Sequence, residues 1–317
     1  MQPKEKLPDQ SWQAVTQTAS PAQVEQYLID EIFKAMGLGA YSQWRKWFGP
    51  VFSPVVSRFA QLGAGFDQSV AQNGFIQTAR TWLQKWAIAP RLQGQENLPV
   101  EGPLLIAANH PGTYDGLSVA ASLPREDLKI VVSGLPFFRS LPSTREYFVY
   151  STREMSVRVA TIRAALRHLL DGGALLIFPS GNLEPDPAYF PQAARQALQR
   201  WSASLEMFLR KVPETKLVVA INAGFIAPEY LRHPLTHLRR SDEARQKLAE
   251  FLQVIWQVIL NHPTLHQPGV FFTPPATLAQ LSGAAGGIPA EISAMAQRLL
   301  EQVSPGDPAG AALTGGD

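Results

Sequence analysis

The chain has no cysteine among its 317 residues. Disulfide bonds, thiolate zinc sites and a cysteine acyl-enzyme are therefore excluded. The sequence also lacks any run of the roughly 18 to 20 apolar residues that a helix needs to span a bilayer. Its first residues, Met1–Lys6, have no apolar segment of the kind found in a secretory signal. We expect a cytoplasmic protein that is either soluble or bound peripherally to the inner face of the membrane.

An excess of charge of one sign is missing as well. Lysine and arginine total 28 against 26 acidic residues, which gives a formal net charge of +2. This balance argues against a dedicated nucleic-acid-binding protein, although a local basic patch remains compatible with it. Apolar residues make up 45% of the chain, as is usual for folded proteins. The length suits one large α/β domain with a smaller element beside it.

Five apolar segments have the length and composition of buried strands, and helical patterns lie between them. Strands that alternate with helices favour an α/β fold with a mixed, largely parallel sheet flanked by helices. An N-terminal helical element precedes this sheet, and a long helix at about 242–260 follows it. The five strands are predicted at 103–108, 129–133, 147–150, 174–178 and 216–222.

Changes in composition divide the chain into five parts. The first is a flexible N-terminus at 1–19, and the second is an aromatic-rich helical element at 20–90, whose first helix is capped by Ser20. An α/β domain at 91–275 comes next. A C-terminal helical segment at 276–303 and a disordered tail at 304–317, rich in Gly, Ala and Pro, complete the chain.

The helical element contains an aromatic stripe. Phe75, Ala79, Trp82 and Trp86 recur at helical spacing, so they share one face of a helix. Two interpretations are open. Either the stripe packs against the α/β domain, or it lies at a membrane surface with aromatic rings at headgroup depth.

The most informative motif is Asn109–Asp115, which directly follows the first predicted strand. Histidine titrates near neutrality, so His110 can take up a proton and return it. A carboxylate five positions on, Asp115, can bond the second ring nitrogen and orient the imidazole. The same spacing recurs at His237 and Asp242 in a polar stretch without a preceding strand, and we assign that pair no role.

A second motif follows the strand at 174–178. Sites in open α/β sheets form at the carboxyl ends of the strands, so this turn and the His110 loop could share a pocket. Gly181 would let a substrate approach backbone N–H groups, which could bind an oxyanion. Between the two motifs, Arg153 follows the strand at 147–150 and could bind a phosphate or carboxylate, or pair with a nearby glutamate. The turn consists of Phe178, Pro179, Ser180, Gly181 and Asn182.

These motifs together resemble the glycerolipid acyltransferases of the lysophosphatidic-acid-acyltransferase type. The resemblance covers somewhat under half of the chain, from Gly94–Pro99 through the two motifs, and weakens towards 218–227. It implies phospholipid biosynthesis, with His110 as general base and Asp115 as its partner. It also implies that Arg153 binds the acceptor's phosphate. The substrate-binding residues that it implies are Asn109, Arg153, Phe178, Pro179, Ser180, Gly181 and Asn182.

The third motif departs from the family pattern Phe-Pro-Glu-Gly-Thr-Arg. Ser180, Asn182 and Leu183 stand where the family usually has Glu, Thr and Arg. Groups expected to hold glycerol phosphate are therefore absent. Glu184 and Asp186, just beyond, have a charge that suits a hydroxyl or amine better than a phosphate. We expect acyl transfer to be retained while the identity of the acceptor stays open.

The sequence therefore predicts an acyltransferase that needs no metal and no resident cofactor. Its partners would be an acyl thioester, either acyl-CoA or acyl-ACP, and a lipid or lysolipid acceptor, at or near a membrane surface and without nucleic acid. Two alternatives remain. One is a non-catalytic lipid-binding relative, and the other is a serine hydrolase using Ser180, although Ser180 lacks the Gly-x-Ser-x-Gly context of a nucleophile elbow.

Overall fold

The computed structural model describes residues 20–35, 42–85, 87–201, 204–260, 264–283 and 286–303. The predicted flexible N-terminus and disordered tail lie outside these residues. The described strands form one seven-stranded sheet in the order β1-β7-β6-β2-β5-β3-β4. From β6 to β4 all neighbours are parallel, whereas β7 runs antiparallel to β6 and β1 runs parallel to β7. The predicted mixed, largely parallel sheet is confirmed.

All five predicted strands are present, with ends within two residues of those expected. The strands β1 and β7 were not predicted, because one is only three residues long and the other is a short Gly-Val-Phe-Phe segment. Such segments are too short to show a periodic pattern. The strands are β1 (Arg91–Gln93), β2 (Leu104–Ala108), β3 (Leu128–Ser133), β4 (Phe148–Ser151), β5 (Ala174–Ile177), β6 (Lys216–Ala223) and β7 (Gly269–Phe272).

Helices occupy most of the remaining described chain. The predicted cap at Ser20 is confirmed, because the Ser20 N–H donates to Gln23 Oε1 at 2.8 Å and the Gln23 N–H donates to Ser20 Oγ at 3.3 Å. This reciprocal pair satisfies two N–H groups at the helix start. The α-helices are α2 (Pro21–Ala35), α3 (Ser42–Asn73), α4 (Phe75–Leu83), α5 (Asp115–Ser122), α6 (Pro136–Arg139), α7 (Met155–Leu170), α8 (Pro191–Leu198), α9 (Ser204–Lys211), α10 (Pro228–Leu231), α11 (Asp242–Leu260), α12 (Leu278–Ser282) and α13 (Gly287–Leu300). Short 3-10 helices are η1 (Gln95–Asn97), η2 (Thr144–Tyr147) and η3 (Pro234–Leu238).

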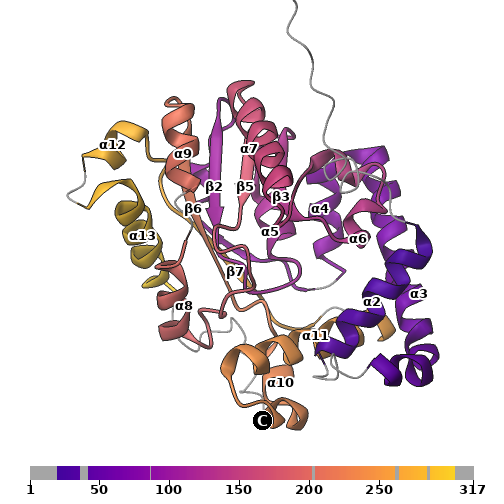
Figure 1. Cartoon of the computed structure of the whole chain (residues 1–317). Coiled ribbons are helices and arrows are strands. Elements are labelled where there is room, and N and C mark those ends of the chain that lie inside the picture. Colours follow the sequence, from indigo (N-terminus) through magenta and orange to yellow (C-terminus); the bar gives the residue numbers. More distant parts are fainter. Residues whose placement is uncertain are drawn as a thin grey trace, which may run out of the picture.

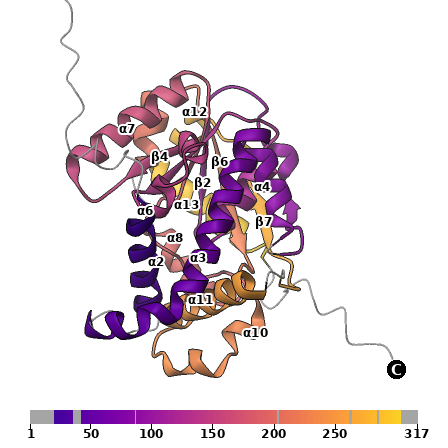
Figure 2. The same cartoon turned by 90° about the vertical axis from the view of Figure 1, so that its right-hand side faces the viewer.

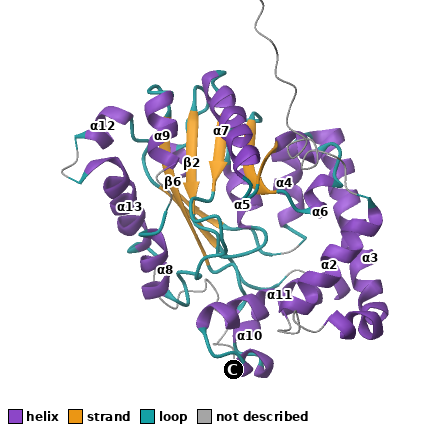
Figure 3. Ribbon diagram, viewed as in Figure 1, coloured by secondary structure: helices purple, strands orange, loops and turns teal. Residues whose placement is uncertain are grey.

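The sheet is buried on both faces (Figures 1 and 3). Leu105 and Ala107 of β2 join a core that includes residues of α7, α8, α9 and α13. Leu104 and Ile106, which point to the opposite face, join a second core with residues of α3, α4 and α5. Because both faces are covered, β2 is a continuous apolar run without polar alternation.

The aromatic stripe packs inside the second core. Phe75, Ala79 and Trp82 are at most 7% exposed, and the rings of Phe66 and Trp82 meet edge to face with their centroids 5.4 Å apart. For these members the packing interpretation is confirmed, because each buried ring removes a large apolar area from water. Trp86 lies outside the described residues. Nowhere in the described segments is a helix both long and apolar enough to traverse a membrane.

The helix α11 lies across the carboxyl ends of the central strands (Figures 1 and 2). Its Gln246 side chain donates to the Pro111 and Glu184 carbonyl oxygens, in the loops that follow β2 and β5. Its Gln253 side chain accepts from the Ala227 N–H, in the segment after β6. One helix therefore connects the loops at the end of the sheet where α/β proteins place their sites.

Replacing Ile106 with alanine should lower the free energy of unfolding by about 2–5 kcal/mol, because it removes a fully buried side chain from a close-packed strand. Urea denaturation followed by circular dichroism measures this change. A matched truncation is Val100→Ala, which removes a side chain from a residue that is 68% exposed. This control should change stability by no more than about 0.5 kcal/mol. Equal effects of the two truncations would contradict the assignment of Ile106 to the core.

Candidate active site

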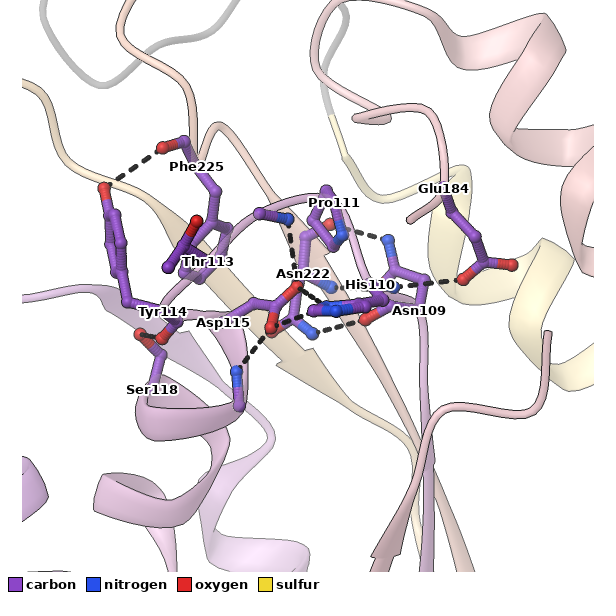
Figure 4. A network of polar contacts seen from close by, with 12 residues as sticks. Asn109, His110, Pro111, Thr113, Tyr114, Asp115, Ser118, Glu184, Asn222 and Phe225 are labelled. Carbon is purple, nitrogen blue, oxygen red and sulfur yellow. Dashed lines mark hydrogen bonds and ion pairs between the residues drawn. The ribbon is translucent and has the colours of Figure 1, made fainter. Parts of the chain in front are cut away.

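His110 and Asp115 face each other across the loop between β2 and α5 (Figure 4). The Nδ1 atom of His110 lies 2.8 Å from Asp115 Oδ2 and 3.0 Å from Oδ1. The carboxyl side chain is 1% exposed, whereas the imidazole is 30% exposed. With Nδ1 directed at the carboxylate, Nε2 is the ring nitrogen left to exchange a proton with a bound molecule.

Backbone groups hold the Asp115 carboxylate in place. The Gly112 N–H donates to Oδ2 at 3.1 Å, and the Gly116 N–H donates to Oδ1 at 2.5 Å. Asp115 is also the first residue of α5, where the helix dipole favours a negative charge. The carboxylate is therefore fixed before any ligand binds, and so is the plane of the imidazole that it contacts.

Opposing effects act on the pKa of His110. Burial lowers this pKa. The adjacent Asp115 carboxylate raises it through its negative charge and its hydrogen bond to the imidazole. Glu250 and Glu184 add smaller effects in the same direction as Asp115, so the pKa of His110 lies above its ordinary value of 6.5. Acidic neighbours thus favour the imidazolium, the form that a general base reaches after it has accepted a proton.

The structure brings the second motif to His110. The Phe178 ring stacks on the imidazole with centroids 4.5 Å apart and an interplanar angle of 29°. The Glu184 N–H donates to the His110 carbonyl oxygen at 2.7 Å, and the His110 N–H donates to Glu184 Oε2 at 3.0 Å. Because β2 and β5 are neighbours in the sheet, the loops that follow them meet.

Within the second turn, the polar groups bond mainly to one another. Gly181 has a φ of 66°, and its N–H donates to the Phe178 carbonyl oxygen at 3.0 Å. Glycine adopts such a positive φ without strain. Ser180 Oγ donates to the Asn182 carbonyl oxygen and accepts from the Asn182 N–H, while Pro179 is buried. The Gly181 N–H is therefore used within the turn, and the binding of an oxyanion by other backbone N–H groups near Gly181 stays a prediction.

Asn109 is 3% exposed and connects two strands. Its Nδ2 donates to the Asn222 carbonyl oxygen at 2.9 Å, and its Oδ1 accepts from the Asn222 N–H at 2.6 Å. In return, Asn222 Nδ2 donates to the Asn109 carbonyl oxygen at 2.9 Å. The Asn109 carboxamide is thus hydrogen-bonded to the end of β6. These bonds fix the position of Asn109, which directly precedes His110. Its contact with a substrate stays a prediction.

Arg153, like His110, follows the carboxyl end of a parallel strand. It lies two residues beyond β4, and its side chain is exposed. In the strand order, β4 is three positions from β2. This offset corresponds to roughly 14 Å, since neighbouring strands are about 4.8 Å apart. The strand that precedes Arg153 is thus separated from the strand that precedes His110, and the binding of a substrate group by Arg153 stays a prediction. Among the described residues, no ion pair joins Arg153 to Glu146 or Glu154.

The two acidic residues beyond the turn are structural anchors. Glu184 is 4% exposed, and its Oε1 accepts from Trp201 Nε1 while its Oε2 binds the His110 backbone. Asp186 is fully buried and accepts from the backbone N–H groups of Gly224 and Phe225 at 2.8 Å. Burial raises the pKa of Asp186 to about 6 despite these bonds. Both carboxylates are therefore bonded within the protein, and the preference for a hydroxyl or amine acceptor stays a prediction.

Sequence reasoning missed the contribution of α11. The positions 246, 250, 253 and 257 carry polar side chains, yet all four are at most 8% exposed. They recur at helical spacing and so share one face of the helix. Polar groups are buried where they have hydrogen-bond partners, so this stripe meets the polar loops of the site. A glutamine-rich stripe on a helix that also has an apolar face was the available signal. The residues are Gln246, Glu250, Gln253 and Gln257.

A serine hydrolase would recruit a histidine that follows Ser180 in the chain, and two of the described candidates, His233 and His266, have other partners. His233 Nδ1 accepts from the Leu235 N–H, and His266 Nε2 lies 3.3 Å from the Tyr114 hydroxyl in the buried interior. Burial lowers the pKa of His266 to about 4, so its imidazole is neutral near pH 7. His262 lies outside the described residues.

Comparisons with known proteins bear on this geometry. A family model described as Acyltransferase matches residues 89–213, which include both motifs. The crystal structure of the 1-acyl-sn-glycerophosphate (LPA) acyltransferase, PlsC, from Thermotoga maritima is similar with 14% identity and a TM-score of 0.42, over 89% of this chain and 95% of that chain. A comparison with curated proteins finds no match. The predicted resemblance to the acyltransferases is confirmed over the matched residues.

Replacing Asp115 with asparagine should lower the pKa of His110, because the substitution removes the negative charge that opposes the effect of burial. NMR titration of the histidine Cε1–H signals measures the change. The signal of His237, an exposed histidine in another part of the chain, serves as an internal reference. A His110 pKa that stays the same in Asp115→Asn would contradict the coupling of the two side chains.

Proposed function

We propose that this chain, whose residues 89–213 belong to the acyltransferase family, transfers a fatty acyl group from a thioester to a hydroxyl or amine of a glycerolipid-type acceptor. The observation that carries the proposal is the partly exposed imidazole of His110, oriented by buried Asp115 and stacked on Phe178 of the second motif. Among the described residues, the hydrogen bonds of the His110 ring go to Asp115 and not to a nucleophilic side chain, which suits a reaction in which the substrate provides the nucleophile.

The proposed step begins with removal of the acceptor's proton by His110 Nε2. As the proton moves to the imidazole, the acceptor oxygen or nitrogen forms a bond to the thioester carbonyl carbon, and the carbonyl oxygen becomes negative. Asp115 lies against Nδ1 and stabilises the imidazolium that forms, as a carboxylate does in a hydrolase triad. Such base assistance is typically worth about 10²- to 10⁴-fold in rate.

Collapse of the tetrahedral intermediate completes the transfer. The carbon–sulfur bond breaks, the carbonyl bond is restored, and the proton held on His110 passes to the departing thiolate. The products are the acylated acceptor and a free thiol, and His110 returns to its neutral form. Because His110 accepts and then donates the same proton, a side chain that ordinarily titrates near neutrality suits both half-steps.

The substrates belong to the same proposal. The donor is a fatty acyl thioester, acyl-CoA or acyl-ACP, and it acts as a co-substrate rather than a resident cofactor. We propose a lipid or lysolipid acceptor that reaches the site from the inner face of a membrane. Arg153 follows β4, three strands from β2, and its proposed role is to bind a phosphate of the acceptor through its guanidinium.

Replacing His110 with alanine should reduce acyl transfer by at least about 10²-fold, because the substitution removes the proposed base. The protein should remain folded, since the imidazole is partly exposed. Mass spectrometry of products formed from acyl-CoA or acyl-ACP and a panel of lysolipids measures turnover. The matched control is His237→Ala, which alters an exposed histidine with the same spacing to an aspartate, Asp242.

Unchanged turnover in the folded His110→Ala variant would contradict the proposal. Binding of lysolipids without turnover of any thioester would instead favour the lipid-binding alternative, which the departures at Ser180, Asn182 and Leu183 motivate. Labelling of Ser180 by a fluorophosphonate would favour the serine hydrolase. We expect no such label, because Ser180 Oγ is bonded to the Asn182 backbone.

Replacing Arg153 with alanine should raise KM for a phosphate-bearing acceptor roughly tenfold and leave kcat nearly unchanged, because a charged hydrogen bond to the distant phosphate is lost in ground and transition state alike. Steady-state kinetics with the acceptor varied measures the effect. Arg158→Ala, which removes an exposed arginine from nearby α7, should leave KM unchanged. Equal KM values for wild type and Arg153→Ala would contradict this role.

A further inference from the structure

Glu250 of α11 is a charged residue that contacts the His110 loop from outside the matched family region. It is 8% exposed, and its Oε1 accepts a hydrogen bond of 2.5 Å from the Thr113 hydroxyl. The same oxygen would lie 3.8 Å from a Cβ atom placed on Gly112. The carboxyl group is therefore packed against the part of the loop that joins His110 to Asp115.

The neighbouring side chains of α11 make this contact rigid. One turn earlier, Gln246 Nε2 donates to the Pro111 carbonyl oxygen at 3.0 Å. Three residues later, Gln253 Nε2 donates to the Phe225 carbonyl oxygen at 3.0 Å and lies 3.4 Å from the Tyr114 hydroxyl. The helix thus contacts the loop at Pro111, Thr113 and Tyr114 through three polar side chains on one face.

We propose that Glu250 is a positioning residue of the acyl-transfer site, which fixes the His110 loop through Thr113 and supplies a negative charge that acts on the imidazole. This inference depends on the proposed function for its effect on turnover, and it adds a residue of α11 that the two motifs do not contain. Glu250 acts through Thr113 and His110, and it needs no contact with substrate.

The charge of Glu250 changes in the pH range where the enzyme would work. Burial raises the pKa of Glu250 to about 7, whereas the Thr113 hydrogen bond and the charge of His110 oppose this increase. Glu250 in turn raises the pKa of His110. The two groups therefore titrate as a coupled pair, in which loss of the Glu250 proton strengthens the binding of a proton by His110.

Other ionisable groups face this pair from the loops of the site. His110 in the β2–α5 loop and Asp115 at the start of α5 are the charges with the largest effects on the pKa of Glu250. From the loop after β5, Glu184 acts on His110, whereas the carboxylate of Asp186 is bound to the backbone after β6. The acidic groups of both loops therefore act on the imidazole in the same direction as Glu250.

The remaining neighbours include two buried neutral groups and two exposed ion pairs. Tyr114 and His266 are neutral near pH 7 because burial shifts both pKa values away from neutrality. On α11 itself, two exposed ion pairs lie close in sequence to Glu250. They join Arg245 to Asp242 and Lys247 to Glu243.

The helices packed against α11 bring further charges. The described charged residues of α2 include Glu25 and Asp30, and those of α3 include Arg58 and Asp67. Asp67 is bonded to the Ser143 and Thr144 backbone. None of the charged residues of these two helices is among the largest influences on the pKa of Glu250. Glu229 of α10 and His237 of η3, two further elements that pack against α11, are likewise not among these influences.

The test replaces Glu250 with glutamine, which keeps the shape and the hydrogen bond to Thr113 but removes the charge. NMR titration of the His110 Cε1–H signal in the full-length protein should show a pKa lower by roughly half a pH unit. The acidic limb of the kcat/KM profile should move to lower pH by a similar amount. The matched control is Glu243→Gln, which removes the same charge from an exposed position two turns earlier on α11 and should move neither quantity.

A second variant, Thr113→Val, separates the loop contact from the charge. It removes the hydroxyl that binds Glu250, and we expect kcat to fall several-fold while the His110 pKa changes less than in Glu250→Gln. Circular dichroism checks that each variant is folded. Should folded Glu250→Gln show the wild-type His110 pKa and the wild-type pH profile, the inference would be overturned.

The two proposals fail in different ways. A lowered His110 pKa in Glu250→Gln, with no thioester turnover by the wild-type protein, would support the position of Glu250 and contradict acyl transfer. Turnover that requires His110 but has the same pH profile and His110 pKa in Glu250→Gln would support acyl transfer and overturn the role of Glu250.

Discussion

The contact between His110 Nδ1 and the buried Asp115 carboxylate is the interaction around which the site is arranged. It requires that a strand, β2, end directly before Asn109 and that a helix, α5, begin at Asp115. Two backbone N–H groups hold the carboxylate in place, and the ring of Phe178 covers the imidazole. A histidine held by these contacts has its Nδ1 atom bonded to the carboxylate, while its Nε2 atom can exchange a proton. A general base needs such a nitrogen.

The surroundings of this pair are unusually acidic for a chain with a net charge of only +2. Glu184, Asp186 and Glu250 are all at most 8% exposed near the carboxyl ends of the strands. Each is bonded to backbone or to a side-chain donor, which offsets the cost of its burial. Asp115, Glu250 and Glu184 keep the His110 pKa raised although burial alone would lower it. The same carboxylates therefore bond to the loops of the site and raise the affinity of His110 for a proton.

Much of the scaffold could be predicted from local patterns. The five strands β2 to β6, the capped start of α2 and the extent of α11 follow from apolar runs, from a capping box and from helical periodicity. The two site motifs were recognisable because each follows such a strand. The roles of individual motif residues were less predictable. The Asn109 side chain bonds to Asn222, 113 residues away, and the Gly181 N–H bonds to the Phe178 carbonyl oxygen, three residues away.

The sequence by itself determined that a strand leads into a histidine with a carboxylate five residues on, and that a second strand leads into a Pro-Ser-Gly turn. These features are local, since they depend on neighbouring residues in the chain. Only the tertiary structure decided that β2 and β5 are adjacent, so that Phe178 stacks on His110. It alone placed α11 over the loops and brought Glu250 to Thr113, 137 residues away in sequence. Such contacts arise from the packing of the whole sheet and its helices, which no local pattern encodes.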